Sequence, residues 1–224
     1  MTRTLKQRLV KLGDIALKGL LAAVLLAIAT VAAQPADMVL PPPQTEGGKP
    51  LMQALKERRT TRSFAERALP PQVLSNLLWA AWGINRPDGH RTAPSARNWQ
   101  EIDVYVALAD GLYVYDARAH ALKRIVAQDL RAAAGTQAHA REAPLTLVYV
   151  ADERRMGSAD EETRRTYAAA DAGFIAQNVY LFCASEGLGS VVFASIDRGR
   201  FAQAAGLRPE QRVILGQSVG YPKK

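Results

Sequence analysis

The sequence predicts an α+β domain built on an antiparallel or mixed sheet. Short apolar stretches typical of strands are interspersed with amphipathic helical stretches, but the two kinds do not alternate as a doubly wound parallel sheet requires. In addition, Asp110 and Gly111 separate two strand-like runs, which predicts a hairpin and therefore an antiparallel pair. Residues 50–224 carry this pattern, and a segment of that length fits one domain with a substantial core.

Residues 1–33 have the order of a secretory signal. The first 18 residues carry five basic side chains and one acid, and an apolar run from Gly19 to Ala33 follows. The small residues before Gln34 suit cleavage. The alternative is an uncleaved anchor, although the run is shorter than the roughly 20 residues of a membrane span. We therefore expect export, with the protein either periplasmic or anchored at the outer face of the inner membrane.

Residues 34–49 contain three consecutive prolines and a Gly-Gly pair, which predict a stiff linker ending in a flexible joint. Without residues 1–33 the chain keeps 24 basic and 20 acidic side chains, too small an excess to indicate a nucleic-acid partner. A membrane contact is expected only through an uncleaved N-terminal segment. The single cysteine, Cys183, excludes an intrachain disulfide, and its apolar neighbours predict a buried structural thiol.

Helices are predicted from Pro50 up to a basic run at residue 58, and from Pro70 or Pro71 to the stop at Gly83. Residues 85–98 are rich in turn formers and predict a loop. The expected strands are 102–108, 112–115, 122–126, 144–150, 191–196 and 213–219, and the further helices are 167–185 and 200–205. The charged segment 153–165 lacks an apolar period, so we expect a mobile, solvated loop there.

The run Arg58-Arg59-Thr60-Thr61-Arg62 is suited to bind an anion. Arginine presents a rigid fork of donors that matches phosphate oxygens, and threonine hydroxyls can complete the shell. The alternative is a solvated basic end of a helix, where cations complement the helix dipole.

The loop of residues 91–100 offers a hydroxyl, Ser95, and two carboxamides, Asn98 and Gln100, which can bind a flat heteroaromatic edge or a polyol. The alternative interpretation of this loop is a turn whose side chains satisfy its own backbone.

Gly187-Leu188-Gly189 lacks the third glycine of a dinucleotide loop and predicts a helix cap. The three histidines have no partners at ligand spacing, so no metal site is expected.

Several motifs in order resemble the FMN-dependent nitroreductase family, over nearly everything from Leu51 to Lys224. They are the arginine run, Ala93–Gln100, Ala176-Gln177-Asn178, Gly187–Val191 and Val219–Lys223. Residues 78–84 and the preceding Leu40-Pro41-Pro42-Pro43 are similar to the branch that contains the azoline dehydrogenases of thiazole and oxazole peptide biosynthesis.

The resemblance implies a nitroreductase-like fold and an intertwined homodimer with FMN at the subunit interface. Phosphate and ribityl contacts fall on Arg58, Arg59, Thr60 and Arg62, and contacts from the partner subunit on Pro94, Ser95, Ala96 and Asn98. Backbone N–H groups near flavin N5 fall on Ala194 and Ser195, and a C-terminal basic contact on Lys223 or Lys224. The resemblance identifies no catalytic side chain, because the flavin carries the redox chemistry.

The expected activity is electron or hydride transfer from a reduced donor, NAD(P)H or another, to a small unsaturated or aromatic acceptor. The alternatives are an exported flavin-binding module without its own turnover and a peptide azoline dehydrogenase.

Two departures from the family pattern lie in and directly after the loop of residues 91–100: Arg97 replaces a frequent glycine, and Glu101-Ile102 stands where many relatives carry Pro-Trp. We expect Arg97 either to favour an anionic substrate or donor, or to pack.

Overall fold

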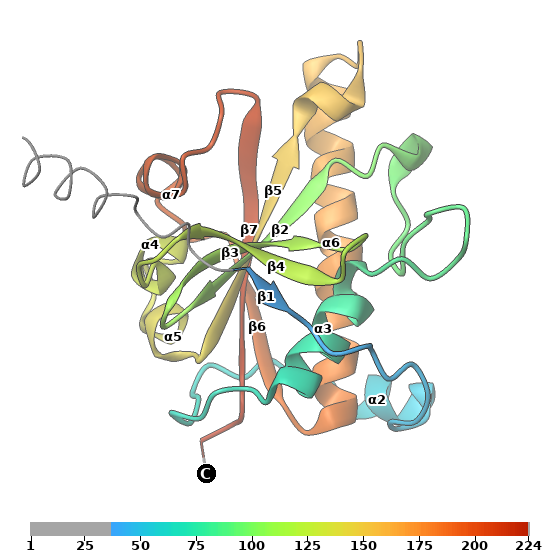
Figure 1. The fold of residues 1–224 in the computed structure, drawn as a ribbon, viewed down its shortest axis with the longest axis vertical. Helices are drawn as coiled ribbons and strands as arrows, with labels where there is room; N and C mark the ends of the chain where they lie inside the picture. The colour runs from blue at the N-terminus through green and yellow to red at the C-terminus, as the bar shows by residue number, and fades with distance from the viewer. Residues whose placement is uncertain (1–36, 224) are drawn as a thin grey trace, which may run out of the picture. The chain divides into compact units, whose positions relative to one another are not determined.

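The computed structural model describes residues 37–223, so the predicted signal or anchor and Lys224 lie outside the described residues. Seven antiparallel strands form one sheet in the order β1-β4-β3-β2-β5-β7-β6 (Figure 1). The strands are β1 (Met38–Val39), β2 (Ile102–Leu108), β3 (Gly111–Asp116), β4 (Ala121–Val126), β5 (Leu145–Asp152), β6 (Gly189–Phe193) and β7 (Gln211–Gly220). The α+β prediction is confirmed.

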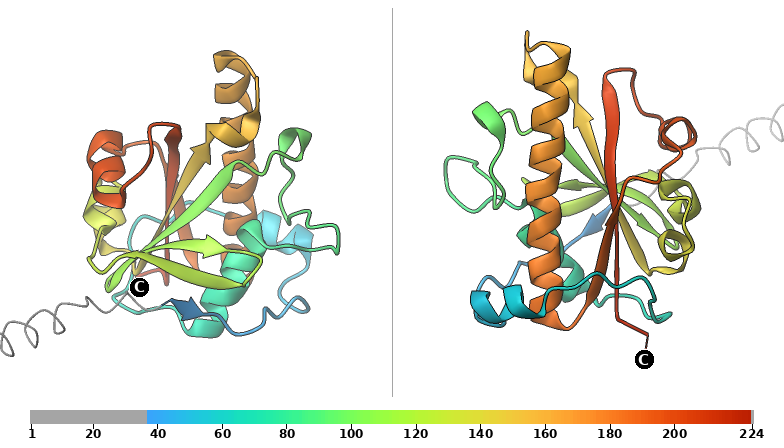
Figure 2. Two further views of the ribbon diagram at one scale, coloured as in Figure 1. Left: turned by 45° about the horizontal axis from the view of Figure 1, so that its top comes forward. Right: turned by 180° about the vertical axis from the view of Figure 1, so that it is seen from behind.

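Helices cover both faces of the sheet (Figures 1 and 2). They are α2 (Leu51–Glu57), α3 (Pro71–Trp82), α4 (Arg131–Ala134), α5 (Ala138–Glu142), α6 (Glu161–Glu186) and α7 (Arg198–Ala205), with short 3₁₀ helices η1 (Ala96–Asn98) and η2 (Glu153–Met156). Along β2, Val104 and Val106 pack with α3 and α6, whereas Tyr105 and Ala107 pack with α4, α5 and α7. The period of two along a strand thus divides the core into two clusters.

Strand β5 is the centre of the sheet. All eight of its residues are buried, and it pairs with β2 on one side and β7 on the other. Because helices cover both of its faces, neither face can carry polar side chains freely, which explains the continuous apolar run in the sequence. The prediction of a central strand here is confirmed.

The prediction of a mobile loop over residues 153–165 is wrong, because this segment contains η2 and the first turn of α6. The Asp160 side chain caps the helix by accepting from Thr163 N at 2.7 Å. Ion pairs hold the charged residues: Arg212 of β7 contacts both Glu153 and Glu161. The alternating charges are therefore one side of a network with β7, which local sequence cannot reveal.

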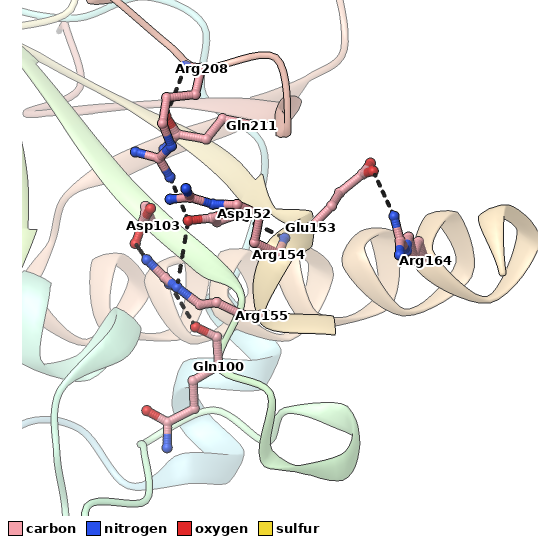
Figure 3. Close-up of polar contacts among 9 residues, drawn as sticks. All are labelled: Gln100, Asp103, Asp152, Glu153, Arg154, Arg155, Arg164, Arg208 and Gln211. Atoms are coloured by element: carbon pink, nitrogen blue, oxygen red, sulfur yellow. Dashed lines mark hydrogen bonds and ion pairs between the residues drawn. The ribbon is translucent and has the colours of Figure 1, made fainter. Parts of the chain in front are cut away.

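A buried carboxylate anchors η2 to the end of the sheet (Figure 3). Asp152 is 4% exposed and its Oδ2 accepts from Arg208 Nη2 at 2.6 Å. Arg155 bonds Asp103 Oδ1 at 2.7 Å and the carbonyl of Gln100 at 2.9 Å. A buried charge needs such partners, and the network ties η2 to the loop that precedes β2.

The prediction of a linker over residues 34–49 is corrected for its described part, and the folded unit begins at Asp37 instead of residue 50. Met38 and Val39 form β1, which pairs with β4, and Leu40 is 4% exposed in the core. The prolines that predicted a stiff linker instead run along the domain, because the carbonyls of Pro41 and Pro42 accept hydrogen bonds from the side chains of Ser75 and Gln72 on α3.

The other predicted elements are confirmed with small shifts at their ends, and the loop at 85–98 contains only η1. The two short helices α4 and α5 were not predicted, because four or five residues give no readable periodicity. Among residues 37–223, no helix has the length and apolar character that a membrane span would need.

Ser75→Ala should destabilise the protein, because Ser75 is fully buried and joins three segments. Its hydroxyl donates to Pro41 O at 2.6 Å and lies 2.7 Å from His120 Nε2. Alanine would remove one hydrogen-bond partner from each of these groups, at a cost of about 1–3 kcal/mol. Urea denaturation measures the loss. Ser158→Ala, at an exposed position, is the control and should change little; equal stability of both variants would contradict the proposed role of this contact.

Candidate functional site

The arginine run crosses the margin of the sheet where β6 begins. Helix α2 ends at Glu57, and the chain then continues extended, with Thr61 N donating to Ser190 O at 2.9 Å. Farther along, the N–H of Lys223 donates to Ser63 O at 3.1 Å. Strand β6 and the C-terminal segment thus fix the backbone of the run and of Ser63 beside it.

The arginines separate onto two sides of this margin. The guanidinium of Arg58 lies 5.3 Å from the ring centroid of Tyr180 on α6. Arg62 lies on the side of α5, where burial and then the charge of Arg62 lower the pKa of His139. Phe64 follows on that same side and packs against Ala143. The run therefore presents cations along an edge instead of converging on one point within a single chain.

A cavity of about 540 Å³ opens beside Arg58 and Arg59. Its volume is in the range of small-molecule sites. Four cations and one carboxylate, Glu57, line it together with hydroxyl and apolar groups. The lining residues are Lys49, Lys56, Glu57, Arg58, Arg59, Thr61, Tyr180, Cys183, Ala184, Gly187, Leu188 and Pro222.

The charge of this region is largely uncompensated. Lys49 pairs with Glu57 at 2.5 Å, but within residues 37–223 no carboxylate forms an ion pair with Arg58, Arg59 or Arg62. Unpaired guanidinium groups next to hydroxyls fit a phosphate, which takes charge-assisted and bidentate hydrogen bonds. The donor set thus agrees with the anion-binding interpretation of the run.

Tyr180 is a site residue that sequence reasoning missed. Its hydroxyl accepts from Val192 N at 2.9 Å, on the edge of β6 that β7 leaves free, and lies 3.5 Å from Thr60 Oγ1. The only sequence signal was a tyrosine within a helix of small and apolar residues. Lys49 and Lys56 were also missed, and tertiary packing alone brings them to the cavity.

Cys183 reaches the same cavity, but it is 2% exposed and free of any disulfide. Burial raises the pKa of its thiol far above the ordinary value, so the sulfur stays protonated and unreactive. The prediction of a buried structural thiol is confirmed. Within residues 37–223, no three His, Cys, Asp or Glu side chains lie together as a metal-binding group.

The second predicted segment, Pro94 to Asn98, lies elsewhere on the same protomer. Ala96 N donates to Asp171 Oδ2 at 3.0 Å, in the first half of α6. Tyr180 is nine residues farther along that helix, or roughly 14 Å at 1.5 Å per residue. Pro94 and Asn98 are exposed, and Ser95 and Ala96 are half-buried. One chain therefore does not bring the loop and the arginine run together.

The loop is both self-bonded and strained. Ser95 Oγ accepts from Gln100 N at 2.8 Å, as the turn interpretation expects. Three residues that are not glycine, Arg97, Asn98 and Gln100, have φ of 52°, 54° and 49°. Such left-handed backbone costs of order 1–3 kcal/mol at each position and clusters at functional sites. The Arg97 guanidinium lies 5.1 Å from the Trp99 ring centroid, so this side chain packs.

Ala194 and Ser195 follow β6 and are both exposed. Their carbonyls are engaged: Ser195 O accepts from Thr136 N at 2.9 Å, and Ala194 O from Ile196 N at 2.9 Å. Outside the sheet ladder, neither of their own N–H groups donates to any acceptor within 37–223. This turn thus has backbone donors available to a ligand. Lys223 is exposed next to Ser63, and Lys224 lies outside the described residues.

Gly189→Ala should disturb the arginine run, because a Cβ at Gly189 would lie 2.7 Å from both Cβ and Cγ2 of Thr61. Either the run or β6 must move, and overpacking of this kind costs about 1–3 kcal/mol. Thermal or urea unfolding measures the loss. Gly199→Ala is the matched control, since its nearest neighbour lies at 3.7 Å and alanine favours its helix. Equal stability of the two variants would show that Thr61 is free to move.

The sequence profile of the nitroreductase family matches residues 55–221. The chain is 32% identical over 151 residues to the candidate nitroreductase MJ1384 of Methanocaldococcus jannaschii, covering 63% of this chain and 76% of that protein. The crystal structure of a candidate nitroreductase from Ralstonia eutropha is similar with a TM-score of 0.81 and 44% identity, covering 87% of this chain and 93% of that one.

Two distant structures share the fold alone. The NADPH:FMN oxidoreductase of Vibrio harveyi complexed with NAD+ has a TM-score of 0.59 and 20% identity, covering 78% of this chain and 69% of that one. The microcin synthetase McbBCD complex of E. coli, with truncated pro-MccB17 bound, has a TM-score of 0.66 and 17% identity, covering 88% and 82%. The expected nitroreductase-like fold is confirmed, and the chain belongs to the nitroreductase family, whose members are generally oxidoreductases.

Proposed function

We propose that this protein is an FMN-dependent oxidoreductase that passes electrons from a reduced donor to a small unsaturated or aromatic acceptor. The observation that carries the proposal is the set of unpaired arginines at the margin of the sheet in a member of the nitroreductase family. Bound FMN supplies the redox chemistry, while the protein binds it, orients it and tunes its charge.

The phosphate end of FMN is assigned to the arginine run. In this proposal Arg58 and Arg59, which line the cavity, supply cations for a group with a charge near −2, and Arg62 adds a further cation from the other side of the margin. Thr60, between Arg59 and Arg62 in the sequence, adds a hydroxyl. Lys223, whose N–H is tied to Ser63 beside the run, adds a further cation, and the same role is proposed for Lys224. Because these arginines form no ion pair with a carboxylate of residues 37–223, binding the phosphate breaks no ion pair within the described part of the chain.

The flavin ring is assigned to two other segments. The N–H groups of Ala194 and Ser195, which donate to no acceptor outside the sheet ladder within residues 37–223, are assigned to a ring nitrogen such as N5. Pro94, Ser95, Ala96 and Asn98 form the strained loop beside the first half of α6, and in this proposal they reach the FMN held by the partner subunit. That assignment follows from their distance from the run in a single chain.

A homodimer is part of the proposal. Helix α2 exposes Leu51, Met52 and Leu55 at 62, 75 and 44%, and α6 exposes Phe174 at 47%. A shallow, mostly apolar groove of about 350 Å³ lies among α2, α3 and α6, next to these side chains. Exposed apolar surface of this kind marks association sites. We assign this surface to the second copy of the chain.

Two alternatives have specific support. The fold is shared with the McbBCD complex, which was solved with a truncated propeptide bound, and this favours peptide azoline oxidation. An exported flavin-binding module without turnover is favoured by the sequence of residues 1–33, because NAD(P)H is scarce outside the cytoplasm. We propose export to the periplasm or to the outer face of the inner membrane, with NAD(P)H, a quinol or a redox partner as donor. Reduction of the bound flavin by one of these donors would separate an oxidoreductase from a module without turnover.

Arg58→Ala and Arg62→Ala should each weaken FMN binding about tenfold or more. A charge-assisted contact contributes about 1.5–3 kcal/mol, and 1.4 kcal/mol is tenfold in affinity. Quenching of flavin fluorescence on titration into apoprotein measures the dissociation constant. Arg118→Ala, in an exposed turn of the β3–β4 hairpin, is the matched control and should bind as the parent does.

The visible spectrum of the parent protein and its reduction by donors test the proposed FMN dependence directly. Protein reconstituted with FMN should show the visible spectrum of an oxidised flavin, and stopped-flow mixing with NADH, NADPH or a quinol should bleach it. Protein that stays colourless after reconstitution overturns the assignment of FMN. A coloured protein that none of the donors reduces favours the module without turnover.

Met52→Asp should weaken the homodimer, because it buries a charge in the assigned apolar surface. Met52 is 75% exposed in one chain, so the monomer should tolerate the change. Sedimentation velocity over a range of concentrations measures the association. Val39→Asp, at a residue 81% exposed on β1, is the control. A parent protein that sediments as a monomer, or equal association of the two variants, would exclude this surface as the interface.

A further inference from the structure

Two buried carboxylates meet behind the strained loop. Glu101 lies between the loop and β2 and is 0% exposed, and Asp171 lies on α6 and is 1% exposed. Two negative charges at one buried site repel each other and lack water to stabilise them, so such a pair holds one proton. Burial, followed by the neighbouring Asp171, raises the pKa of Glu101 to about 7.

Each carboxylate bonds one of two consecutive loop residues. Asp171 Oδ2 accepts from Ala96 N at 3.0 Å, and Glu101 Oε2 accepts from Ser95 Oγ at 3.3 Å. The other carboxylate oxygen of Glu101, Oε1, is buried with no donor among the described residues. That oxygen is therefore the one suited to carry the shared proton toward Asp171.

The backbone of Glu101 is also fixed, because its carbonyl accepts from Asp152 N at 2.9 Å in the ladder with β5. The pair thus connects the sheet, α6 and the loop. Arg155 of η2 bonds the carbonyl of Gln100, the residue before Glu101, and pairs with Asp103 instead of with the two acids. Arg97 extends over Trp99 instead.

The loop needs such an anchor. Its left-handed residues, Arg97, Asn98 and Gln100, lie between Ala96 and Glu101, which the pair holds at the two ends. Strained backbone persists only where its surroundings determine it. Without the two carboxylate contacts, the loop would relax away from the conformation that exposes Pro94 and Asn98.

We infer that Glu101 and Asp171 share one proton and act as a positioning pair, which fixes the Pro94–Asn98 loop in the conformation that contacts the FMN of the partner subunit. The contact with FMN rests on the proposed function, whereas the fixing of the loop does not. Both are positioning residues, since neither is placed on the cofactor itself.

The direction of the pH dependence follows from the proton. Glu101 binds its proton more tightly in the folded chain than in the unfolded one, whose carboxyl has an ordinary pKa of 4.5. Its contribution to stability is complete below about pH 4.5 and is lost as the pH rises through about 7. Above that pH two carboxylates face each other, so the loop loosens.

Glu101→Gln tests the pair directly. The amide can donate to Asp171 and accept from Ser95 at every pH, so it imitates the protonated state. Between pH 6 and pH 8.5, the FMN affinity of the parent should fall about tenfold more than that of E101Q. A tenfold change in affinity corresponds to a difference of about one pH unit between the pKa of Glu101 with FMN bound and without it. The phosphate of FMN titrates near pH 6 in both proteins and cancels in this comparison.

Asp171→Asn is the second variant, because its amide can also bridge the two sites and relieve the repulsion. It should match E101Q, which keeps the test valid if either variant fails to fold. Asp116→Asn is the matched control: Asp116 is a half-buried carboxyl on β3, and its hydrogen bond with Lys123 keeps its pKa below the ordinary value, so the pH profile of this variant should follow the parent. Identical pH profiles of parent, E101Q and D171N would overturn the inference.

Amide hydrogen exchange in the apoprotein separates this inference from the proposed function. After correction for intrinsic rates, Ala96 N–H should be more protected at pH 6 than at pH 8.5 in the parent, and equally protected at both in E101Q. If no variant binds FMN but this pattern is found, the cofactor assignment fails and the positioning pair remains. Equal protection of Ala96 at both pH values in the parent overturns the pair, whatever FMN does.

Discussion

The burial of β5 on both faces is the constraint on which the rest of the structure depends. Its eight residues form the central strand, with β2 and β7 as neighbours, and each face needs its own cover. Helices α3 and α6 supply one cover, and the shorter α4, α5 and α7 supply the other. Because helices cover both faces of the sheet, the groups of the candidate site lie at the margins of the sheet and along α6.

The two halves of the candidate site lie at such margins. The arginine run is held at the beginning of β6, and the strained loop lies beside the first half of α6, roughly 14 Å away along the helix from Asp171 to Tyr180. A single chain therefore presents a cationic edge in one place and a shaped loop in another. In the proposed dimer the exposed faces of α2 and α6 bring the loop of one subunit to the run of the other.

Two kinds of electrostatic imbalance distinguish these margins from the rest of the surface. At the run, Arg58, Arg59 and Arg62 form no ion pair with a carboxylate of residues 37–223, whereas Asp152 shows how the same fold compensates a buried charge with Arg208 when the role is structural. Beneath the loop, Glu101 and Asp171 are two acids that no cation of the described chain pairs with, and a shared proton is the way we propose to neutralise them. Uncompensated charge is costly in a folded protein, so such imbalances are retained where a ligand or a conformation needs them.

The sequence by itself determined the fold class, the central strand and helix α3, because local periodicity carries these, and the side-chain chemistry of Arg58 to Arg62 is the basis of the proposed anion site. It did not determine β1 or the first turn of α6, since the partners that hold them, β4 and Arg212, are distant in the chain. Only the tertiary structure placed Tyr180 beside Arg58 and Glu101 beside Asp171. Contacts between remote residues depend on how the sheet brings its margins together, and no local pattern records them.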